Sequence, residues 1–236
     1  MENELGSSFQ VLWEDNDFIV VSKPVGLLVD AGNGSDDLVR RVRASESSRA
    51  SVFAFHRLDR ETSGVVLMGK TRRYARDVTK LFEEKRIRKA YLAVVNGEWP
   101  ITLGRVDTAI ENRPASTTFR RLVSGTFGGS PRSLIEALPK TGRTHQIRLH
   151  CSGEGYAILG DERYGSVRSP QNAKHGVGQA LHAYRLDFRH PANGVTISVR
   201  SEPTLWRETW LADFDGGASA AKLDTIWKKL FEGVAK

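Results

Sequence analysis

The chain has 236 residues, 27% of them charged and 39% hydrophobic, which excludes a disordered or fibrous protein and allows a core of ordinary size. Lysine and arginine number 35 against 28 acidic residues, so the net charge of +7 indicates either a polyanionic partner or simply a basic surface. The single cysteine, Cys151, excludes an intramolecular disulfide and a cysteine-cluster metal site. No apolar run is long enough for a membrane span and the N-terminal residues are too polar for a secretory signal, so we expect a cytoplasmic protein.

The N-terminal part of the chain is predicted to begin with strands. Runs rich in β-formers over 9–14 and 17–22 flank a two-residue turn, which is typical of a hairpin. Ser35 is expected to cap a short basic helix with two aspartates in its first turn. Further strands are predicted over 52–55 and 65–68, on either side of a polar segment.

The middle of the chain contains one amphipathic helix pattern followed by a series of strands. Thr71 is expected to cap the helix, whose apolar residues recur at helical spacing. The strand patterns that follow cover 90–96, 116–123, 133–138, 180–188 and 195–200. Because these strands succeed one another without intervening helices, the sequence favours an α+β fold, with a mixed, mainly antiparallel sheet and flanking helices.

The C-terminal residues are predicted to be helical. Beyond Pro203, two helical patterns are separated by Gly216 and Gly217, and the second carries one apolar stripe. Such a stripe predicts that the tail packs on the rest of the protein. We therefore expect one sheet-containing domain over 1–202 and a helical extension over 203–236 packed on it.

Neither a nucleotide site nor a metal site is convincingly encoded. Residues 64–71 match G-x-x-x-x-G-K-[ST], but a phosphate-binding loop needs a strand before its first glycine and a flexible loop after it. Here the residues between Gly64 and Gly69 are themselves predicted to be a strand. The five-residue spacing of His145 and His150 would put them on different helix faces, and no HExxH motif occurs. No metal ion and no cofactor is therefore expected.

Two polar segments flanked by strands, 56–64 and 140–150, are unusual in this sequence. In an arbitrary protein, Asp59 beside Arg57 and Arg60 would be a solvated ion pair that contributes little. However, residues 56–64, HRLDRETSG, resemble the catalytic motif of the RluA-type pseudouridine synthases position for position. Four other segments are similar to motifs of that family and occur in the same order: 17–27, 89–93, 141–150 and 181–183. The resemblance covers roughly residues 9 to 200.

The resemblance implies a pseudouridine synthase fold and an enzyme that isomerises uridine to pseudouridine in RNA without metal or energy source. It implies that Asp59 is the catalytic carboxylate, which forms a covalent adduct or abstracts a proton while the glycosidic bond is broken. By the same match, Arg148 would keep that carboxylate ionised and Tyr91 would stack on the target base. Without the resemblance, Arg148 is one more RNA-facing arginine and Tyr91 a core tyrosine.

The resemblance also implies which residues bind the substrate. The target base must leave the RNA stack to react, and Arg57 matches an arginine that can take its place. Ile147 and Leu181 match apolar residues that wall the uracil pocket, although each would otherwise be read as core. The remaining residues expected to bind substrate are His56, Thr62, Arg143, His145 and Gln146.

RNA, ribosomal or transfer, is the expected partner, and no obligatory protein partner is evident. Basic residues cluster before Tyr91, and a phosphate-binding face and a merely solvated helix face are about equally compatible with them. Those expected to contact the RNA backbone are Arg72, Arg76, Lys80 and Lys89.

Two departures from the family pattern put local RNA contacts in doubt. Asp30 stands where the family commonly has histidine, and Gly178 where a basic residue is common. The first motif begins near Phe9, so we expect no N-terminal S4-like RNA-binding domain. An inactive RNA-binding protein on the same fold remains the main alternative, but such a protein has no need of Asp59, Tyr91 and Arg148 together.

Overall fold

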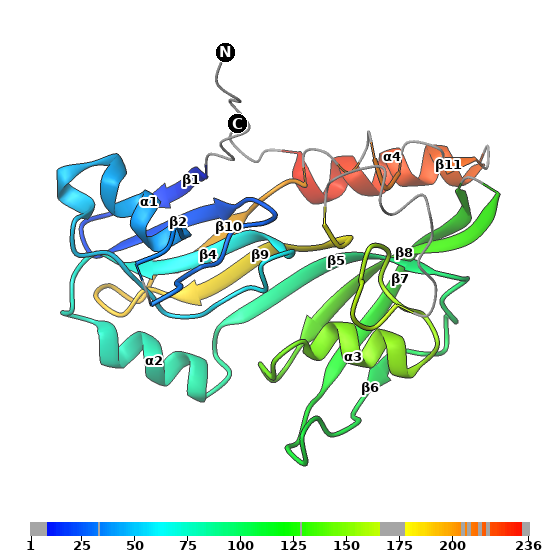
Figure 1. Cartoon of the computed structure of the whole chain (residues 1–236), viewed down its shortest axis with the longest axis horizontal. Coiled ribbons are helices and arrows are strands. Elements are labelled where there is room, and N and C mark those ends of the chain that lie inside the picture. Colours follow the sequence, from blue (N-terminus) through cyan, green and yellow to red (C-terminus); the bar gives the residue numbers. More distant parts are fainter. Residues whose placement is uncertain are drawn as a thin grey trace.

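The computed structural model describes residues 9–32, 34–127, 129–165, 178–203, 206, 209–211, 214–215 and 218–232. These form an α+β fold in which α4 lies along one side of a long sheet and α2 and α3 along the other (Figure 1). The strands are β1 (Gln10–Glu14), β2 (Phe18–Lys23), β3 (Phe53–Ala54), β4 (Ser63–Gly69), β5 (Arg88–Asn96), β6 (Arg105–Val106), β7 (Thr117–Phe127), β8 (Ser130–Pro139), β9 (Leu181–Arg189), β10 (Thr196–Arg200) and β11 (Phe214–Asp215). The helices are α1 (Leu38–Ser45), the 3₁₀ turn η1 (Ser47–Arg49), α2 (Ala75–Glu83), α3 (Gln146–Gly153) and α4 (Ala218–Phe231).

The sheet has the order β1-β2-β4-β9-β5-β8-β7-β11, with β3, β6 and β10 paired to β4, β7 and β9. Its named strand pairs are antiparallel except β4 with β9, which run parallel and join Gly64 to Ala183. The predicted mixed, mainly antiparallel sheet is therefore confirmed. Through this parallel pair, the end of the polar segment 56–64 lies beside the start of β9, the strand that carries Leu181.

The strand at 63–69 also explains why the phosphate-loop pattern is misleading. The residues between Gly64 and Gly69 pair with β2 over their whole length. Gly64 has φ +116°, and a Cβ there would lie 2.2 Å from the carbonyl oxygen of Ala183. The glycine is required for close strand contact and not for phosphate binding.

We expect Gly64→Ala to destabilise the protein by about 2 kcal/mol or more, because the methyl group would separate β4 from β9 and φ is positive there. Urea unfolding at neutral pH would measure this loss. The matched control is Gly155→Ala, which has φ +84° and no atom within 4 Å of the added Cβ, so it tests backbone strain alone. Equal losses for the two variants would contradict the proposed clash.

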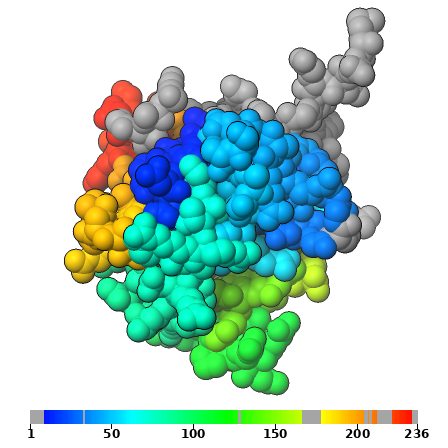
Figure 2. All heavy atoms as spheres, turned by 90° about the vertical axis from the view of Figure 1, so that its left-hand side faces the viewer, coloured from blue at the N-terminus to red at the C-terminus, as the bar shows by residue number. Residues whose placement is uncertain are grey.

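Both faces of β2 are buried, so this part of the sheet lies between two apolar clusters. Ile19 and Val21 point into the larger apolar cluster, whereas Phe18 and Val20 point into the smaller one. Helices α1, α3 and α4 contribute to the larger cluster and α2 to the smaller. Seen from the end that carries α1 and α2, the α2 segment lies below the α1 segment (Figure 2).

Two predicted helix caps are wrong. Asp37, and not Ser35, caps α1, because its Oδ1 accepts the Arg40 N–H at 2.8 Å while its Oδ2 accepts the Ala31 N–H at 2.9 Å. Helix α2 begins at Ala75 rather than after Thr71, whose hydroxyl instead donates to Asp17 at 2.7 Å. Asp37 is held at the start of α1 by its contact with Ala31, whereas α2 starts after Tyr74 without a side-chain cap.

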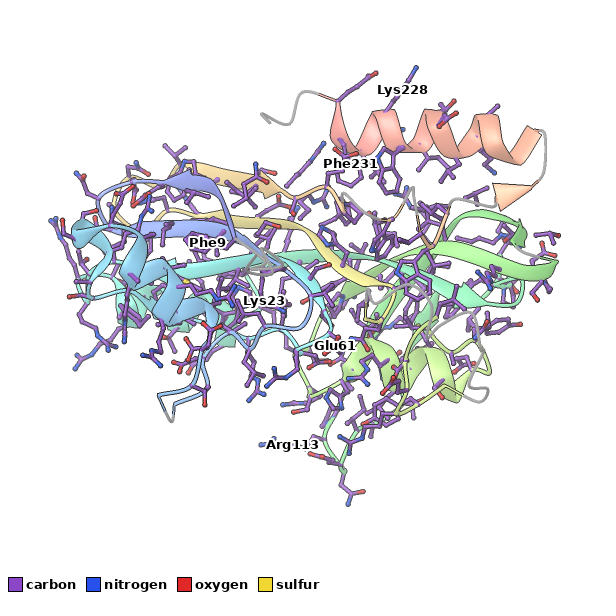
Figure 3. All side chains as sticks on the ribbon, turned by 45° about the horizontal axis from the view of Figure 1, so that its top comes forward. Phe9, Lys23, Glu61, Arg113, Lys228 and Phe231 are labelled. Atoms are coloured by element: carbon purple, nitrogen blue, oxygen red, sulfur yellow. The ribbon has the colours of Figure 1, made fainter. Side chains whose placement is uncertain are left out.

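The second C-terminal pattern forms α4, which packs on the sheet. Phe231 points toward the strands and Lys228 away from them (Figure 3). Arg200 Nη1 donates to the Leu230 carbonyl at 2.9 Å, which ties the helix to β10. The first pattern is not helical where it is described, since Trp206 and residues 209–211 lie in turns and bends and β11 follows. Residues 204, 205, 207, 208, 212 and 213 lie outside the described residues.

Candidate active site

A cleft of about 990 Å³ lies between the end of α2, β5, the 56–62 segment and residues 138–148. Its charged lining is strongly basic. Two acidic residues, Asp59 and Glu83, reach it, against eight basic ones: Arg57, Lys85, Arg88, Lys89, Lys140, Arg143, Arg148 and Arg185. Such an excess of cations attracts a polyanion to the cleft.

The cleft brings together most of the residues that the sequence singled out. Those lining it are His56, Arg57, Asp59, Thr62, Lys89, Tyr91, Arg143, His145, Gln146, Ile147, Arg148 and Leu181. Arg72, Arg76 and Lys80 do not line the cleft and lie on or just before α2. The predicted site residues thus fall into two groups: those that line the cleft, and three exposed basic residues on or just before α2.

Asp59 lies in the turn that leads into β4, where its own carbonyl accepts the Thr62 N–H at 3.1 Å. Its carboxylate is 23% exposed, and its Oδ2 accepts a hydrogen bond from Nη1 of Arg148 at 3.0 Å. The residues that meet here are 89 positions apart in sequence. The Asp59 carboxylate is thus bound by one cation and stays partly accessible from the cleft.

Arg148 holds a second carboxylate on its other side. Its Nε and Nη2 donate to the two oxygens of Asp161 at 2.7 and 2.8 Å, and the Asp161 side chain is only 1% exposed. Burial opposes the charge on Arg148, but Asp161 and Asp59 outweigh it and raise the pKa of the guanidinium. Burial likewise opposes the charge on Asp161, and Arg148 with the backbone N–H groups of Tyr164 and Arg163 lowers its pKa overall.

The sequence reasoning missed Asp161 and Tyr164. The Tyr164 ring lies 5.0 Å from the guanidinium carbon of Arg148, so it covers the cation, and Tyr164 Oη lies 2.9 Å from Nδ1 of His145. The only signal in the sequence is a polar turn, residues 160–165, after an apolar run. That signal is too weak to identify a site, because turns of this composition are common.

His145 completes the surroundings of Asp59. It adopts the left-handed conformation with φ 55° just before α3, and its Nε2 lies 3.6 Å from Oδ1 of Asp59. Burial lowers the pKa of His145, with Asp59 opposing the shift. If Tyr164 donates its hydroxyl hydrogen to Nδ1, the neutral ring directs an Nε2–H toward Asp59.

Lys23 is a further residue that the sequence reasoning did not assign. Only 1% exposed at the end of β2, it donates from Nζ to the carbonyls of Pro24 and Leu27 at 2.8 Å and of Arg60 at 3.0 Å. Burial lowers the pKa of Lys23 to about 7, while Glu61 and Asp59 oppose the shift. Figure 3 shows Lys23 and Glu61 in the same central region. The lysine fixes the turn after β2 against the segment that carries Asp59.

Tyr91, Ile147 and Leu181 form an apolar part of the cleft wall and are each less than 10% exposed. Burial and the negative charge of Asp59 both raise the pKa of the Tyr91 phenol, which therefore stays protonated at neutral pH. One aromatic ring and two aliphatic side chains therefore face the same cleft as Asp59 and can bind a flat, partly apolar group.

Three other residues of the predicted set make hydrogen bonds within the protein. His56 Nε2 accepts the Leu67 N–H at 3.0 Å, and burial lowers the pKa of His56 to about 3. Thr62 Oγ1 accepts from Gln179 at 2.6 Å. Gln146 bonds through both amide atoms, accepting from Thr141 and the Arg143 N–H and donating to Ser116 and Thr117. Their contact with substrate stays a prediction.

The basic residues expected at the RNA backbone lie in different surroundings. Arg72 stacks over Phe53 at 4.0 Å, Arg76 is exposed, and Lys80 lies 3.7 Å from Glu84 in an exposed pair. Lys89 is half-buried in the cleft wall, and burial lowers its pKa. These positions are compatible with phosphate binding, which stays a prediction for all four.

The described part of the chain contains neither a metal-binding cluster nor a helix that could cross a membrane. In the described residues no three histidine, cysteine, aspartate or glutamate side chains gather as a metal site. His150 bonds to Thr117 through Nδ1 and to the Thr108 carbonyl through Nε2. No helix within the described ranges has the length and apolar character that crossing a membrane requires.

Comparison with known proteins identifies the family. A model of the RNA pseudouridylate synthase family matches residues 17–153, and the chain belongs to this family. It is 34% identical over 224 residues to ribosomal large subunit pseudouridine synthase C of Buchnera aphidicola, covering 85% of this chain and 69% of that protein. It is 36% identical over 221 residues to synthase D of Neisseria meningitidis, covering 82% and 58%.

A solved structure supports the fold. Human RNA pseudouridylate synthase domain containing 1 superposes with a TM-score of 0.74 at 24% identity, and the match covers the whole of both chains. The two bacterial relatives are longer than this chain, which spans 69% and 58% of their lengths. The predicted family and fold class are confirmed.

Proposed function

We propose that this protein isomerises uridine to pseudouridine in RNA. The observation that carries the proposal is the ion pair between Asp59 and Arg148 at 3.0 Å, in a basic cleft walled by Tyr91. The reaction breaks the bond between C1′ and N1 of the uracil and joins C1′ to C5, while C5 loses a proton and N1 gains one. It needs no oxidant, reductant or water.

One accessible carboxylate suits this chemistry. Glycoside hydrolases typically use two carboxyl groups, one to protonate the leaving group and one to activate water or attack the sugar. Here Asp161 is buried and bonded to Arg148 through both oxygens. Of the two acidic residues that line the cleft, Glu83 lies at the end of α2, and Asp59 is the one that accepts from Arg148. Arg148 binds Oδ2 of Asp59, so Oδ1 is the oxygen that we assign to the ribose, either as a nucleophile at C1′ or as a base.

The base would be held by the apolar part of the cleft. Tyr91 provides a ring on which uracil can stack, and Ile147 and Leu181 add apolar packing beside it. Flipping the base out of the RNA costs a few kcal/mol. Arg57, at the cleft edge and exposed, is placed to fill the vacated space or to bind the adjacent phosphate.

The substrate that we propose is ribosomal RNA, because the bacterial relatives are named for the large ribosomal subunit. A cytoplasmic location and action without an obligatory protein partner belong to the same proposal. Pseudouridine mapping in cells with and without this gene tests it. We expect one or a few uridines of the large-subunit RNA to lose modification without the gene and to regain it when the gene is restored. An unchanged map, or changes confined to transfer RNA, would contradict the assignment.

The basic face of α2 supplies a prediction about RNA binding. Replacing Arg76 and Lys80 with glutamate should weaken binding to all RNAs and reduce the slope of log affinity against log salt by up to about 0.7 to 0.9 per lost phosphate contact. Fluorescence titration at several salt concentrations measures the slope. Lys228→Glu with Lys229→Glu, on the exposed face of α4, is the control for net charge. Equal effects of the two pairs would mean that α2 is a merely solvated face.

A further inference from the structure

Arg148 is shared unequally between two carboxylates. Asp161 accepts from Nε and Nη2, the two donors on one edge of the guanidinium, whereas Asp59 accepts from Nη1 alone. The Asp161 side chain is 1% exposed and does not line the cleft, so it does not meet the substrate directly. The buried Asp161 thus occupies the two-donor edge of the guanidinium, and the carboxylate in the cleft receives a single donor.

Asp161 has a second, separable set of contacts. Its Oδ1 also accepts the N–H groups of Arg163 and Tyr164, both at 3.1 Å, which closes the turn after Gly160. Gly160 itself has φ +73°, and a Cβ there would lie 2.3 Å from the Gly178 carbonyl, so the turn is tightly packed. An asparagine at 161 could keep an oxygen for these two N–H groups while removing the charge.

We propose that Asp161 is a positioning residue that fixes the guanidinium of Arg148 so that one donor alone reaches Asp59. The proposal rests on the proposed function. Without Asp161, Arg148 could turn its two-donor edge to Asp59, because bidentate pairing with a carboxylate is the stronger geometry. Asp59 would then be held more firmly and its oxygens would be less available to the ribose.

Asp161 also keeps Arg148 paired during the reaction. Whether Asp59 joins C1′ or takes a proton, it loses its negative charge at that step. Arg148 would then be a partly buried cation without its cleft partner, which is unfavourable unless another carboxylate balances it. Asp161 provides that balance throughout, and the other groups around Asp59 cannot, since Lys23 is basic, Tyr91 stays a neutral phenol, and burial favours the neutral form of His145.

The test separates positioning from folding. For Asp161→Asn we expect the single-turnover rate at saturating enzyme to fall about 10- to 100-fold, with RNA affinity within about threefold of wild type. The control is Glu14→Gln, which removes a carboxylate that is also paired with an arginine, Arg49, but does not line the cleft, so the rate should be unchanged. A wild-type rate for Asp161→Asn would overturn the proposal.

A double-mutant cycle asks whether Asp161 acts through Arg148. If it does, adding Asp161→Asn to Arg148→Ala should change the rate by less than about threefold, since the cation to be positioned is already gone. If the rate losses of the two single variants instead multiply in the double variant, the proposal is overturned and the role of Asp161 is to hold the turn.

Should Asp161→Asn fail to fold, Asp161→Glu takes its place. Glutamate keeps the negative charge but displaces it, so the single-turnover rate should fall while RNA affinity stays unchanged. A wild-type rate would overturn the proposal. Inactive wild-type enzyme would instead reject the proposed function itself.

Discussion

Asp59→Asn should abolish tritium release from RNA that carries 5-tritiated uridine, with a loss of about 10⁴-fold or more, while RNA affinity changes little. Asparagine has nearly the shape of aspartate and can still accept from Nη1 of Arg148, so the cleft keeps its form. It lacks the negative charge needed to attack C1′ or to take a proton. Losses of this size are typical when the reacting group itself is removed.

The control for this variant is Asp36→Asn. Asp36 accepts from Arg41 at the exposed start of the α1 region, so it too is an aspartate paired with an arginine, but it does not line the cleft. The Asp36→Asn variant should retain the wild-type rate. Turnover by Asp59→Asn within about tenfold of wild type would reject Asp59 as the catalytic carboxylate.

Arg148→Ala has the second largest expected effect, because it leaves two carboxylates without their shared cation. Removing one partner of a buried pair typically costs about 3 to 5 kcal/mol, and Asp161 is almost fully buried. We expect a lower free energy of unfolding and a large fall in single-turnover rate at saturating enzyme.

Arg148→Lys distinguishes charge from geometry. One ammonium group restores positive charge but cannot reproduce the three hydrogen bonds that Arg148 donates to Asp161 and Asp59. It should therefore rescue the rate only in part. The opposite pattern for Arg148→Ala, with weaker RNA binding and a near-normal rate once the enzyme is saturated, would make Arg148 a phosphate contact.

The strands were predictable from the sequence because their apolar residues alternate or run continuously over lengths typical of strands. The parallel contact of Gly64 with Ala183 was not, since it joins segments far apart in sequence and depends on the missing side chain of Gly64. The cap of α1 was misplaced for a related reason. Several polar residues compete there, and Asp37 prevails because it also accepts the Ala31 N–H.

Some residues of the candidate site could likewise be named from the sequence, and others could not. Asp59, Tyr91 and Arg148 could be named because the segments that carry them resemble motifs of the family in the same order. Lys23 and Asp161 could not, because a lysine at a strand end and an aspartate in a turn are ordinarily solvated. Their roles arise only when three carbonyls converge on Lys23 and Arg148 folds onto Asp161.

The most direct test of the central claim is product analysis with the purified protein. The protein is incubated with unmodified large-subunit RNA in excess chelator and without nucleotide, apart from any magnesium needed to fold the RNA beforehand, and the RNA is then digested to nucleosides. The account predicts that pseudouridine appears in the amount by which uridine falls, with no free uracil. Absence of pseudouridine, release of uracil, or a requirement for a nucleotide would contradict it.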